Sequence, residues 1–352
     1  MSNAVTIAEI AARAGVGTAT VDRVLNERPG VNAETMRKVI AAVKALGQPP
    51  VLRGRPRQRE GYRFAYVLPD SNSSFFDQVE RQIAQTASDF RHQHITEVTY
   101  RFKSDNPTQY AAALAKVADC DGIALLAPDL PGVKQAINEQ VRAGVHVVTL
   151  FSDVAGSMRE AYVGVDNRAA GRTAGLLLAR MAGRAPVAAP RKAACDTLLL
   201  LSQATRFSAE IERRVGFAQV IEERFADLHL LRGPDLPSDD DGVCRQLKRY
   251  LQKDFDATRL AGVYCVGTGS AGIVRALAAV GFTQMPGLAA HDFTDTHQAL
   301  LTSGELAYVL HQDIHYGVLT AARVLRGLCE NVRGALNVVQ PRVEILTAEN
   351  LY

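Results

Sequence analysis

Two threonines and one arginine near the amino terminus lie close together in one short segment and can make polar contacts with another molecule. They lie in residues 15–26, which read GVGTATVDRVLN. Val21 and Val24 fall on one side of a short expected helix, and Arg23 falls on the opposite side. An arginine pairs with guanine through a bidentate hydrogen bond, which gives the residue a geometric basis for base recognition. The pattern therefore predicts a short helix with Arg23 on its exposed side.

A glycine-rich segment in the second half of the chain suits a different chemistry. Residues 267–272 read GTGSAG, follow an expected strand and open an expected helix. Asp292 follows about twenty residues later, which is the context of a dinucleotide-binding fingerprint. The segment lies deep in the second half, however, where a strand-to-helix turn at the mouth of a cleft is also expected. An NAD-type site at Gly267–Gly272 is therefore kept as an alternative.

Histidines offer a further possible chemistry, metal binding. His311 and His315 have the spacing of helical metal ligands, but Gln312-Asp313 reads as a strand-to-helix junction, so the two need not share a face. His291 and His297 have no third ligand pattern nearby. The sequence contains no G-x-S-x-G, P-loop or H-E-x-x-H motif. We expect no metal, no cofactor and no enzymatic activity.

Three short helices are expected to position Arg23. Residues 6–9, Thr-Ile-Ala-Glu, have the form of a capping box that begins the first helix. A second helix is expected over 18–26, and a third from Asn32 or Ala33 to Leu46. A three-residue turn between the first two is the helix-turn-helix pattern, whose second helix lies in the major groove.

The distribution of charge agrees with binding to DNA. Residues 1–59 contain ten Lys or Arg and four Asp or Glu, whereas residues 60–352 contain thirty and thirty-three. The total of +3 therefore combines a basic amino-terminal part with a slightly acidic body. Neutralisation of phosphates by basic side chains drives the sequence-independent part of DNA affinity.

The amino-terminal segment resembles the DNA-binding headpiece of LacI-type regulators, the LacI/GalR family. The resemblance is carried by TIAEIAARAGVGTATVDRVLN and PGVNAETMRKVIAAVKALG. It implies that Thr18 and Ala19 read bases and that Arg23 reaches guanine. It also implies phosphate contacts or helix caps at Thr6, Gly17, Thr20, Asn26 and Thr35. Asp22 departs from the usual serine, and a carboxylate there must accept from cytosine N4 or lie near phosphate at a cost.

Size and composition set the broad class. A chain of 352 residues fits two or three domains, and its apolar content of 47% can supply a sizeable core. It has no apolar run of about eighteen residues and no secretory signal pattern. Five scattered cysteines without a C-x-x-C pair read as reduced thiols. We expect a cytoplasmic, nucleoid-associated protein with no membrane contact.

The expected domains are a helix-turn-helix domain over 1–48, a linker over 49–61 and a two-lobed domain over 62–346. The linker is rich in proline, glycine and arginine. In LacI-type proteins the equivalent segment often forms a hinge helix with a leucine in the minor groove, a pattern that is not evident here. The arginines of this segment either follow the DNA backbone and a narrow minor groove, or belong to a solvated linker.

Beyond the linker, short apolar runs alternate with helical periods. The expected strands of the first half are 64–68, 95–102, 122–127 and 146–150, and those of the second half are 196–202, 229–231, 261–266 and 287–290. Strands that alternate with helices imply parallel sheets covered by helices, and two such sets imply two α/β lobes. A ligand then lies beyond the carboxyl ends of the strands, between the lobes.

Three body segments resemble the ligand-binding domain of the same family, which shares its fold with periplasmic sugar-binding proteins. They are PDSNSSFF (69–76), AYVGVDNRAAGRTAG (161–175) and AHDFTDTHQALLTSGELAYVLHQD (290–313). The resemblance implies three crossings between lobes, which we place near 163–166, 291–294 and 322–326. The N-lobe then comprises 62–163 and 293–323, and the C-lobe comprises 164–292 and 324–346.

The same resemblance nominates residues of a ligand cleft. They are Asp70, Ser73, Phe75, Phe76, Ser152, Asp153, Arg213, Asp292 and Gln312, with Arg214 as an alternative to Arg213. Each has a purely structural alternative, such as a core anchor for the rings, a turn for Ser152-Asp153 or a solvated helix position for the arginine. Carboxylates and an amide beside aromatic rings suit a polyhydroxylated ligand. The cleft therefore favours a sugar, a polyol or a similar small metabolite.

The sequence thus predicts an all-α headpiece joined to a two-lobed, periplasmic-binding-protein-like α/β domain. The predicted function is transcription regulation, expected to be repression, by a homodimer or higher oligomer on a double-stranded, pseudo-palindromic operator. A bound small molecule would change lobe closure and so DNA affinity. The alternatives are a solute-binding protein without a regulatory role and a nucleotide-dependent enzyme built around Gly267–Gly272.

Overall fold

The computed structural model describes residues 6–25, 31–46, 61–71, 73–90, 94–103, 107–183, 196–204, 206–330 and 338–351. The chain divides into two compact units, residues 1–60 and residues 61–352. Asn26 and residues 49–60 of the expected linker lie outside the described residues.

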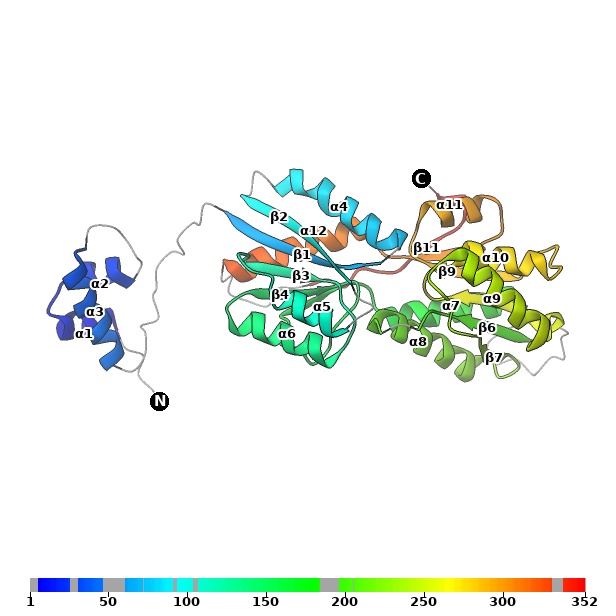
Figure 1. The fold of residues 1–352 in the computed structure, drawn as a ribbon, viewed down its shortest axis with the longest axis horizontal. Coiled ribbons are helices and arrows are strands. Elements are labelled where there is room, and N and C mark those ends of the chain that lie inside the picture. The colour runs from blue at the N-terminus through cyan, green and yellow to red at the C-terminus, as the bar shows by residue number, and fades with distance from the viewer. Residues whose placement is uncertain are drawn as a thin grey trace. The chain divides into compact units, whose positions relative to one another are not determined.

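The amino-terminal unit contains helices α1 (Ile7–Ala14), α2 (Thr18–Leu25) and α3 (Ala33–Ala45), which are labelled in Figure 1. The expected capping box is present, because the Thr6 backbone N–H donates to Glu9 Oε2 (2.7 Å) and the Glu9 N–H donates to Thr6 Oγ1 (3.3 Å). Gly15 ends α1 in the left-handed conformation, with φ of 66°. The apolar faces of the helices meet in a small core of Ile10, Ala11, Val21, Val24, Val39 and Ala42.

The first lobe of the larger unit is a parallel sheet of order β2-β1-β3-β4-β5. Its strands are β1 (Tyr62–Asp70), β2 (Ile95–Lys103), β3 (Gly122–Leu125), β4 (His146–Leu150) and β5 (Ala161–Val163). Helices α4 (Ser74–Phe90) and α12 (Ile314–Cys329) cover one face, and α5 (Pro107–Leu114) and α6 (Pro131–Arg142) cover the other (Figure 1). Burial of both faces explains why β1, β3 and β4 read as apolar runs, whereas the edge strand β2 is only partly buried.

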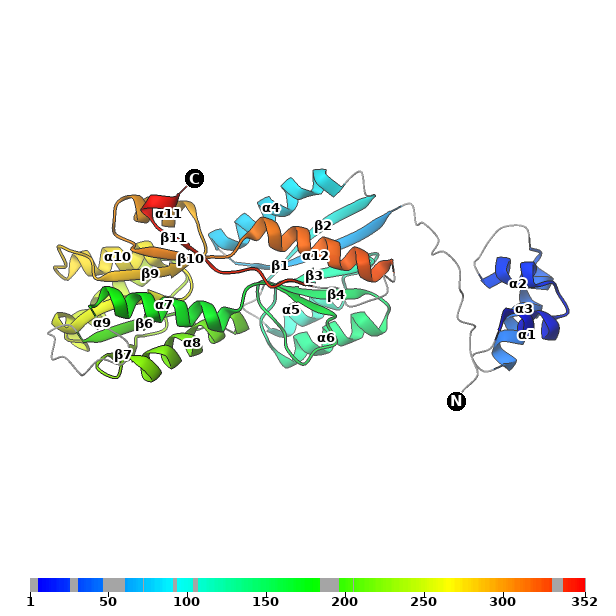
Figure 2. The same ribbon diagram turned by 180° about the vertical axis from the view of Figure 1, so that it is seen from behind.

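The second lobe is a sheet of order β11-β10-β9-β8-β6-β7, parallel except for β11. Its strands are β6 (Thr197–Leu201), β7 (His229–Arg232), β8 (Leu260–Cys265), β9 (Gly287–His291), β10 (Tyr308–His311) and β11 (Glu344–Leu346). Helices α7 (Asn167–Met181) and α8 (Ser208–Arg224) pack on one face (Figure 2). Helices α9 (Asp240–Lys253), α10 (Ser270–Ala279) and α11 (Asp295–Thr302) pack on the other.

Two glycines allow α7 and α8 to approach closely. A Cβ atom at Gly171 would lie 1.9 Å from the carbonyl oxygen of Arg213, and one at Gly216 would lie 2.0 Å from that of Arg168. No side chain fits at such distances from a backbone atom. The glycine pair therefore fixes the separation of these helices and, with it, the position of Arg213.

The predicted assignment of 293–323 to the N-lobe is wrong for α11 and β10. Strand β10 pairs in parallel with β9, because its apolar residues complete the second sheet. The chain therefore crosses after β10, at residues 312–313, and not near 291–294.

The predicted crossing near 322–326 is also wrong. The apolar face of α12 runs without a break from Ile314 to Leu325, and all of it packs in the core of the first lobe. One continuous helix face cannot change lobes, so residues 324–329 belong to the first lobe. The chain returns to the second sheet only at β11.

Candidate functional site

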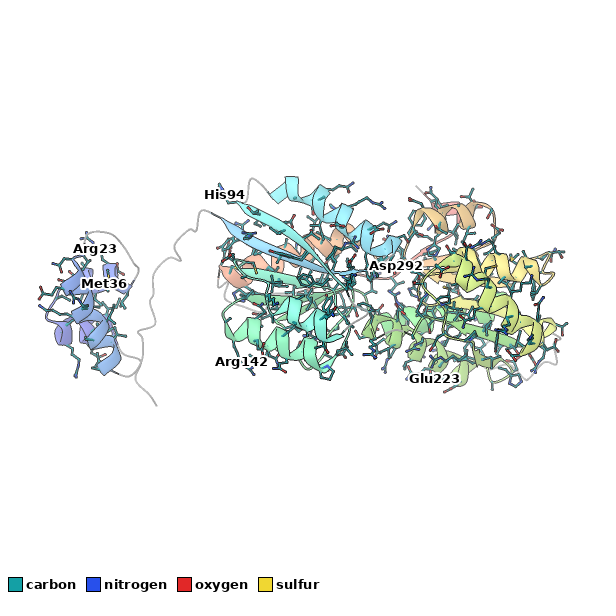
Figure 3. All side chains as sticks on the ribbon, in the orientation of Figure 1. Arg23, Met36, His94, Arg142, Glu223 and Asp292 are labelled. Atoms are coloured by element: carbon teal, nitrogen blue, oxygen red, sulfur yellow. The ribbon has the colours of Figure 1, made fainter. Side chains whose placement is uncertain are left out.

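The outer face of α2 presents the side chains predicted to contact DNA. Thr18, Ala19 and Arg23 are exposed, while Thr20 and Asp22 are partly buried. Figure 3 labels Arg23 on the amino-terminal unit. Val21 and Val24 are buried on the opposite face of the helix and hold it in the three-helix core. The packing thus leaves the face with Arg23 at the surface.

The flanking residues have identifiable backbone roles. The carbonyl of Gly17 accepts hydrogen bonds from the N–H groups of Thr20 (2.9 Å) and Val21 (3.1 Å), so it starts α2. The N–H of Thr35 donates to Asn32 Oδ1 (2.8 Å), which caps α3. Thr6 caps α1. Thr6, Gly17 and Asn32 therefore set the starts of the three helices.

A cavity of about 330 Å³ lies between the lobes of the larger unit. The first lobe lines it with Ser73, Ser74, Phe75, Phe76, Leu126, Phe151 and Ser152. The second lobe lines it mainly with polar residues from the ends of β8 and β9 and from the starts of α8, α9, α10 and α11. The position beyond the carboxyl ends of the strands is where α/β folds bind ligands.

The wall from the first lobe is largely aromatic. Phe75 packs on Phe76 and edge-on against Phe151, with ring centroids 5.8 and 5.6 Å apart. Phe207, from the second lobe, lies 6.0 Å from Phe76 and extends this wall across the cleft. Rings of this kind cover the CH faces of a small ligand.

Phe151 has a strained backbone. Its φ is 59°, which is unusual for a bulky residue, and it follows β4 directly. Its N–H donates to the carbonyl of Val163 (2.8 Å), and the N–H of Ser152 donates to the carbonyl of Leu150 (2.7 Å). This tight turn brings both Phe151 and Ser152 to the cavity.

The wall from the second lobe is built around Arg213 and Asp292. Both are buried, and Arg213 Nη1 lies 3.5 Å from Asp292 Oδ2. Arg213 Nε also donates to Asn167 Oδ1 (2.8 Å). Asp292 follows β9 directly and has a φ of 62°. Figure 3 labels Asp292 at the junction of the two lobes.

Gln312 lines the cavity and carries a buried hydrogen-bond acceptor. Its Nε2 donates to Asp292 Oδ1 (2.9 Å), and because an ionised carboxylate only accepts, this bond fixes the orientation of the amide. Gln312 is 3% exposed, and its Oε1 has no hydrogen-bond partner. A buried acceptor without a partner costs free energy, which a donor group on a ligand would recover.

Two histidines of this wall are neutral. Burial lowers the pKa of His291 well below its usual range, and Arg213 and His297 lower it further. Burial also lowers the pKa of His297. His297 Nδ1 lies 2.6 Å from the carbonyl of Asp292, which only accepts, so Nδ1 carries the proton. His297 Nε2 then accepts from the Ser270 hydroxyl at 3.0 Å.

Seven of the nine nominated cleft residues line this cavity, namely Ser73, Phe75, Phe76, Ser152, Arg213, Asp292 and Gln312. Asp70 and Asp153 do not. Asp70 is exposed at the end of β1. Asp153 forms an ion pair with Arg159 and accepts from Thr149 Oγ1 (2.7 Å), and these bonds lower its pKa although burial raises it. Arg214, the alternative to Arg213, is also absent from the lining.

Sequence reasoning missed several lining residues, namely Phe151, Phe207, Glu210, Asp239, Asp240, Ser270, His291, Thr294 and His297. Most lie at a strand end or in the first turn of a helix, which was a usable signal once the parallel strands were placed. Ser270 belongs to the GTGSAG segment, whose first four residues all line the cavity.

The glycines of GTGSAG have structural explanations. Gly269 has a φ of 104°, and a Cβ at Gly272 would lie 2.4 Å from the carbonyl oxygen of Asp240. The N–H of Gly272, at the start of α10, donates to Asp240 Oδ1 (2.9 Å). A pyrophosphate at this helix end would meet a carboxylate already in place. The geometry therefore argues against the dinucleotide alternative.

Within the described ranges, no three His, Cys, Asp or Glu side chains are grouped as metal ligands. Among the same residues, no helix is long and apolar enough to cross a membrane.

The fold and the cavity define a two-lobed domain of the periplasmic-binding-protein class. Residues 64–331 match the family described as "Periplasmic binding protein domain", and residues 6–50 match "Bacterial regulatory proteins, lacI family". The chain belongs to the periplasmic binding protein domain family, and its amino-terminal unit is a lacI-family headpiece.

Curated relatives match over about a quarter of the chain or less. The chain is 42% identical over 80 residues to the HTH-type transcriptional regulator MalR of Streptomyces coelicolor, which is 22% of each protein. It is 40% identical over 77 residues to the ribose operon repressor of Bacillus subtilis, covering 22% of this chain and 24% of that protein. The matched segment spans about a quarter of each relative's length.

Solved structures share the fold of the body. A putative LacI transcriptional regulator from Bacteroides fragilis superposes with a TM-score of 0.71 at 15% identity, covering 82% of this chain and 98% of that chain. The myo-inositol binding protein of Caulobacter, bound to myo-inositol, superposes with a TM-score of 0.70 at 18% identity, covering 84% of this chain and 96% of that chain. At these identities the likeness shows the fold alone.

Proposed function

We propose that the protein is a sequence-specific DNA-binding transcription regulator, acting as a repressor, whose operator affinity depends on a small molecule in the interlobe cavity. The observation that carries the proposal is the exposed face of α2, with Thr18, Ala19 and Arg23 at the surface of a lacI-family headpiece. Recognition helices of helix-turn-helix proteins read bases from this position.

The proposed oligomer is a homodimer. One headpiece covers one half-site, and a two-fold symmetric dimer doubles both the contacts and the sequence that is read. Such a protein acts in the cytoplasm, on a double-stranded operator.

The proposed effector is a sugar, a polyol or a similar small polar molecule. Its donors would meet Asp292 and Gln312 Oε1, and its CH faces would pack on Phe75 and Phe76. The cavity volume of about 330 Å³ lies at the lower end of the range of ligand pockets.

Direct hydrogen bonds between the lobes supply a means of coupling. The N–H of Asp129 donates to the carbonyl of Arg206 (2.9 Å), and the Ser208 hydroxyl donates to the carbonyl of Asp153 (2.6 Å). Both bonds join the first lobe to the segment that begins α8. A ligand that favours the joined arrangement shifts the lobe equilibrium only by its difference in affinity for the two states.

The test is operator selection with the purified full chain, followed by binding measurements on the selected site. In fluorescence anisotropy, Arg23→Ala should weaken binding by about 1–3 kcal/mol per half-site and reduce the preference for the selected sequence. Arg142→Ala is the matched control, because it removes the same charge from an exposed position on α6 of the body.

Equal loss of DNA binding by both variants would contradict the role of α2. If the wild-type chain selects no sequence at all but still binds a small molecule, the chain is a solute-binding protein and the regulatory proposal fails.

A further inference from the structure

The cavity has an excess of negative charge. Arg213 is the one Lys or Arg among the described lining residues, and its partner there is Asp292. Glu210, Asp239 and Asp240 also line the cavity. The lining thus has four carboxylates and one guanidinium among the described residues. Both lining histidines are neutral, so they add no positive charge.

The three carboxylates lie where helices begin. Asp239 caps α9, with the N–H of Gly242 donating to its Oδ1 (2.7 Å). Asp240 Oδ1 accepts from Gly272 at the start of α10, and Glu210 lies in the first turn of α8. Helix amino termini attract anions, so these positions would ordinarily suit a phosphate or a carboxylate. In this cavity, carboxylates of the chain itself already occupy these helix amino termini.

The neutral polar groups of the second lobe also favour a ligand that donates hydrogen bonds. Gln312 Oε1 is a buried acceptor without a partner, in an amide whose orientation Asp292 fixes. His297 Nε2 accepts from Ser270, which leaves the Ser270 oxygen with lone pairs. Hydroxyl and ammonium groups donate to such atoms, whereas phosphate and carboxylate groups only accept at neutral pH.

Resting on the proposed function, we infer that the effector is rich in hydrogen-bond donors and is not anionic. The cavity selects an amino-bearing sugar or polyol over its uncharged counterpart, and the uncharged compound over its phosphorylated or carboxylated form. Electrostatic repulsion in a partly desolvated cleft is the source of this order.

The test is calorimetric titration of the full chain with compounds matched in scaffold and different in charge. One set is glucosamine, glucose, glucuronate and glucose 6-phosphate, and a second set is built on galactose. An aminocyclitol and its inositol form a third. At low salt, each step towards negative charge should weaken binding about tenfold, which is about 1.4 kcal/mol, and added salt should reduce the differences.

Two variants test whether the cavity carboxylates cause this order of ligand affinities. Glu210→Gln and Asp240→Asn keep hydrogen-bonding side chains and each remove one charge, so each should reduce the amine-to-acid ratio about tenfold. Glu222→Gln is the matched control, because it removes an exposed charge from the same helix as Glu210 outside the cavity lining. The control should keep the wild-type order.

The inference is overturned if an acid or phosphate binds as tightly as its uncharged form, if Glu222→Gln changes the order as much as Glu210→Gln, or if no compound of the three sets binds. Operator binding without ligand, measured on the same preparation, tests the proposed function separately. A chain that selects an operator and prefers an anion refutes this inference only.

Discussion

The two lobes use the same backbone feature to present opposite chemistry to the cavity. Phe151 follows β4 with a φ of 59°, and Asp292 follows β9 with a φ of 62°. Both turn the chain sharply at the carboxyl end of a parallel strand and line the cleft. The first lobe presents an aromatic ring at this point, and the second presents a carboxylate paired with Arg213.

This difference indicates a division of roles. Aromatic rings contribute apolar contact area to many ligands with little dependence on charge, whereas buried polar groups discriminate strongly because a wrong ligand leaves them unpaired. We therefore expect the first lobe to set the strength of binding and the second lobe to set its selectivity.

The largest effect should follow from removal of the cation in the second lobe. Arg213→Met leaves Asp292 buried without its charged partner and should lower the free energy of unfolding by about 3 kcal/mol or more. Urea denaturation measures this change. Arg214→Met removes the same charge from the next position, outside the cavity, and should cost little. Similar losses in the two variants would refute the assignment of Arg213.

The next largest effect should follow from adding a methyl group at a tightly packed glycine in each lobe. Gly216→Ala brings a Cβ to 2.0 Å from a backbone oxygen, whereas Gly317→Ala brings one to 2.5 Å from the Phe151 ring. A ring can shift and a helix backbone cannot, so we expect a loss of about 2–3 kcal/mol for Gly216→Ala and about 1 kcal/mol for Gly317→Ala. Thermal unfolding of both variants would show the order, and a reversed order would contradict this account.

A smaller effect is expected from the aromatic wall. Phe76→Ala removes a ring that packs on Phe75 and Phe207, and it should weaken ligand binding by about 1 kcal/mol, or about fivefold. The loss should be equal for amino, uncharged and acidic ligands. A change in their order would show that the first lobe also carries selectivity.

The smallest effect is a difference in pH response between the lobes. Burial raises the pKa of Glu97, on β2 of the first lobe, to about 7. The folded first lobe therefore binds this proton more tightly than the unfolded chain, and its stability should rise as pH falls from about 7 towards 4.5. The pKa values of His291 and His297 are lowered, so the stability of the second lobe should fall as pH drops below 6.5.

Hydrogen exchange with peptide resolution measures both lobes in one sample. Protection should increase on acidification in peptides of β1 and β2, and decrease in peptides of β9 and α11. Glu97→Gln should abolish the response of the first lobe and leave that of the second. A response of the same sign in both lobes would contradict the pKa assignments.

Much of this arrangement was accessible from the sequence. Local signals sufficed for the headpiece, where the Thr6–Glu9 capping box and the glycine turn at 15–17 define the helices. In the body, the expected strands correspond to β1–β4 and β6–β9, whereas β5, β10 and β11 were not among them. The lobe to which a segment belongs could not be predicted from local signals, because it depends on pairing between strands that are distant in the sequence, such as β10 with β9.

The cleft was predicted less completely for the same reason. Asp153 follows a strand end, as the predicted pattern requires. Its carboxylate forms an ion pair with Arg159, however, and Asp153 does not line the cavity. Glu210 and Asp240 read as ordinary acidic residues at helix starts. Only the arrangement of the helix starts and strand ends in the folded lobe reveals that they line the same cavity.

The left-handed backbone at Asp292 limits which replacements the site accepts. Asparagine and glycine tolerate this conformation, while most other residues do not. Both are reached from an aspartate codon by a single nucleotide change. Either would keep the turn that follows β9 but would remove the carboxylate that pairs with Arg213 and accepts from Gln312. The ligand preference of this protein can therefore diverge between lineages by one-step mutations at a position that is otherwise under strong steric constraint.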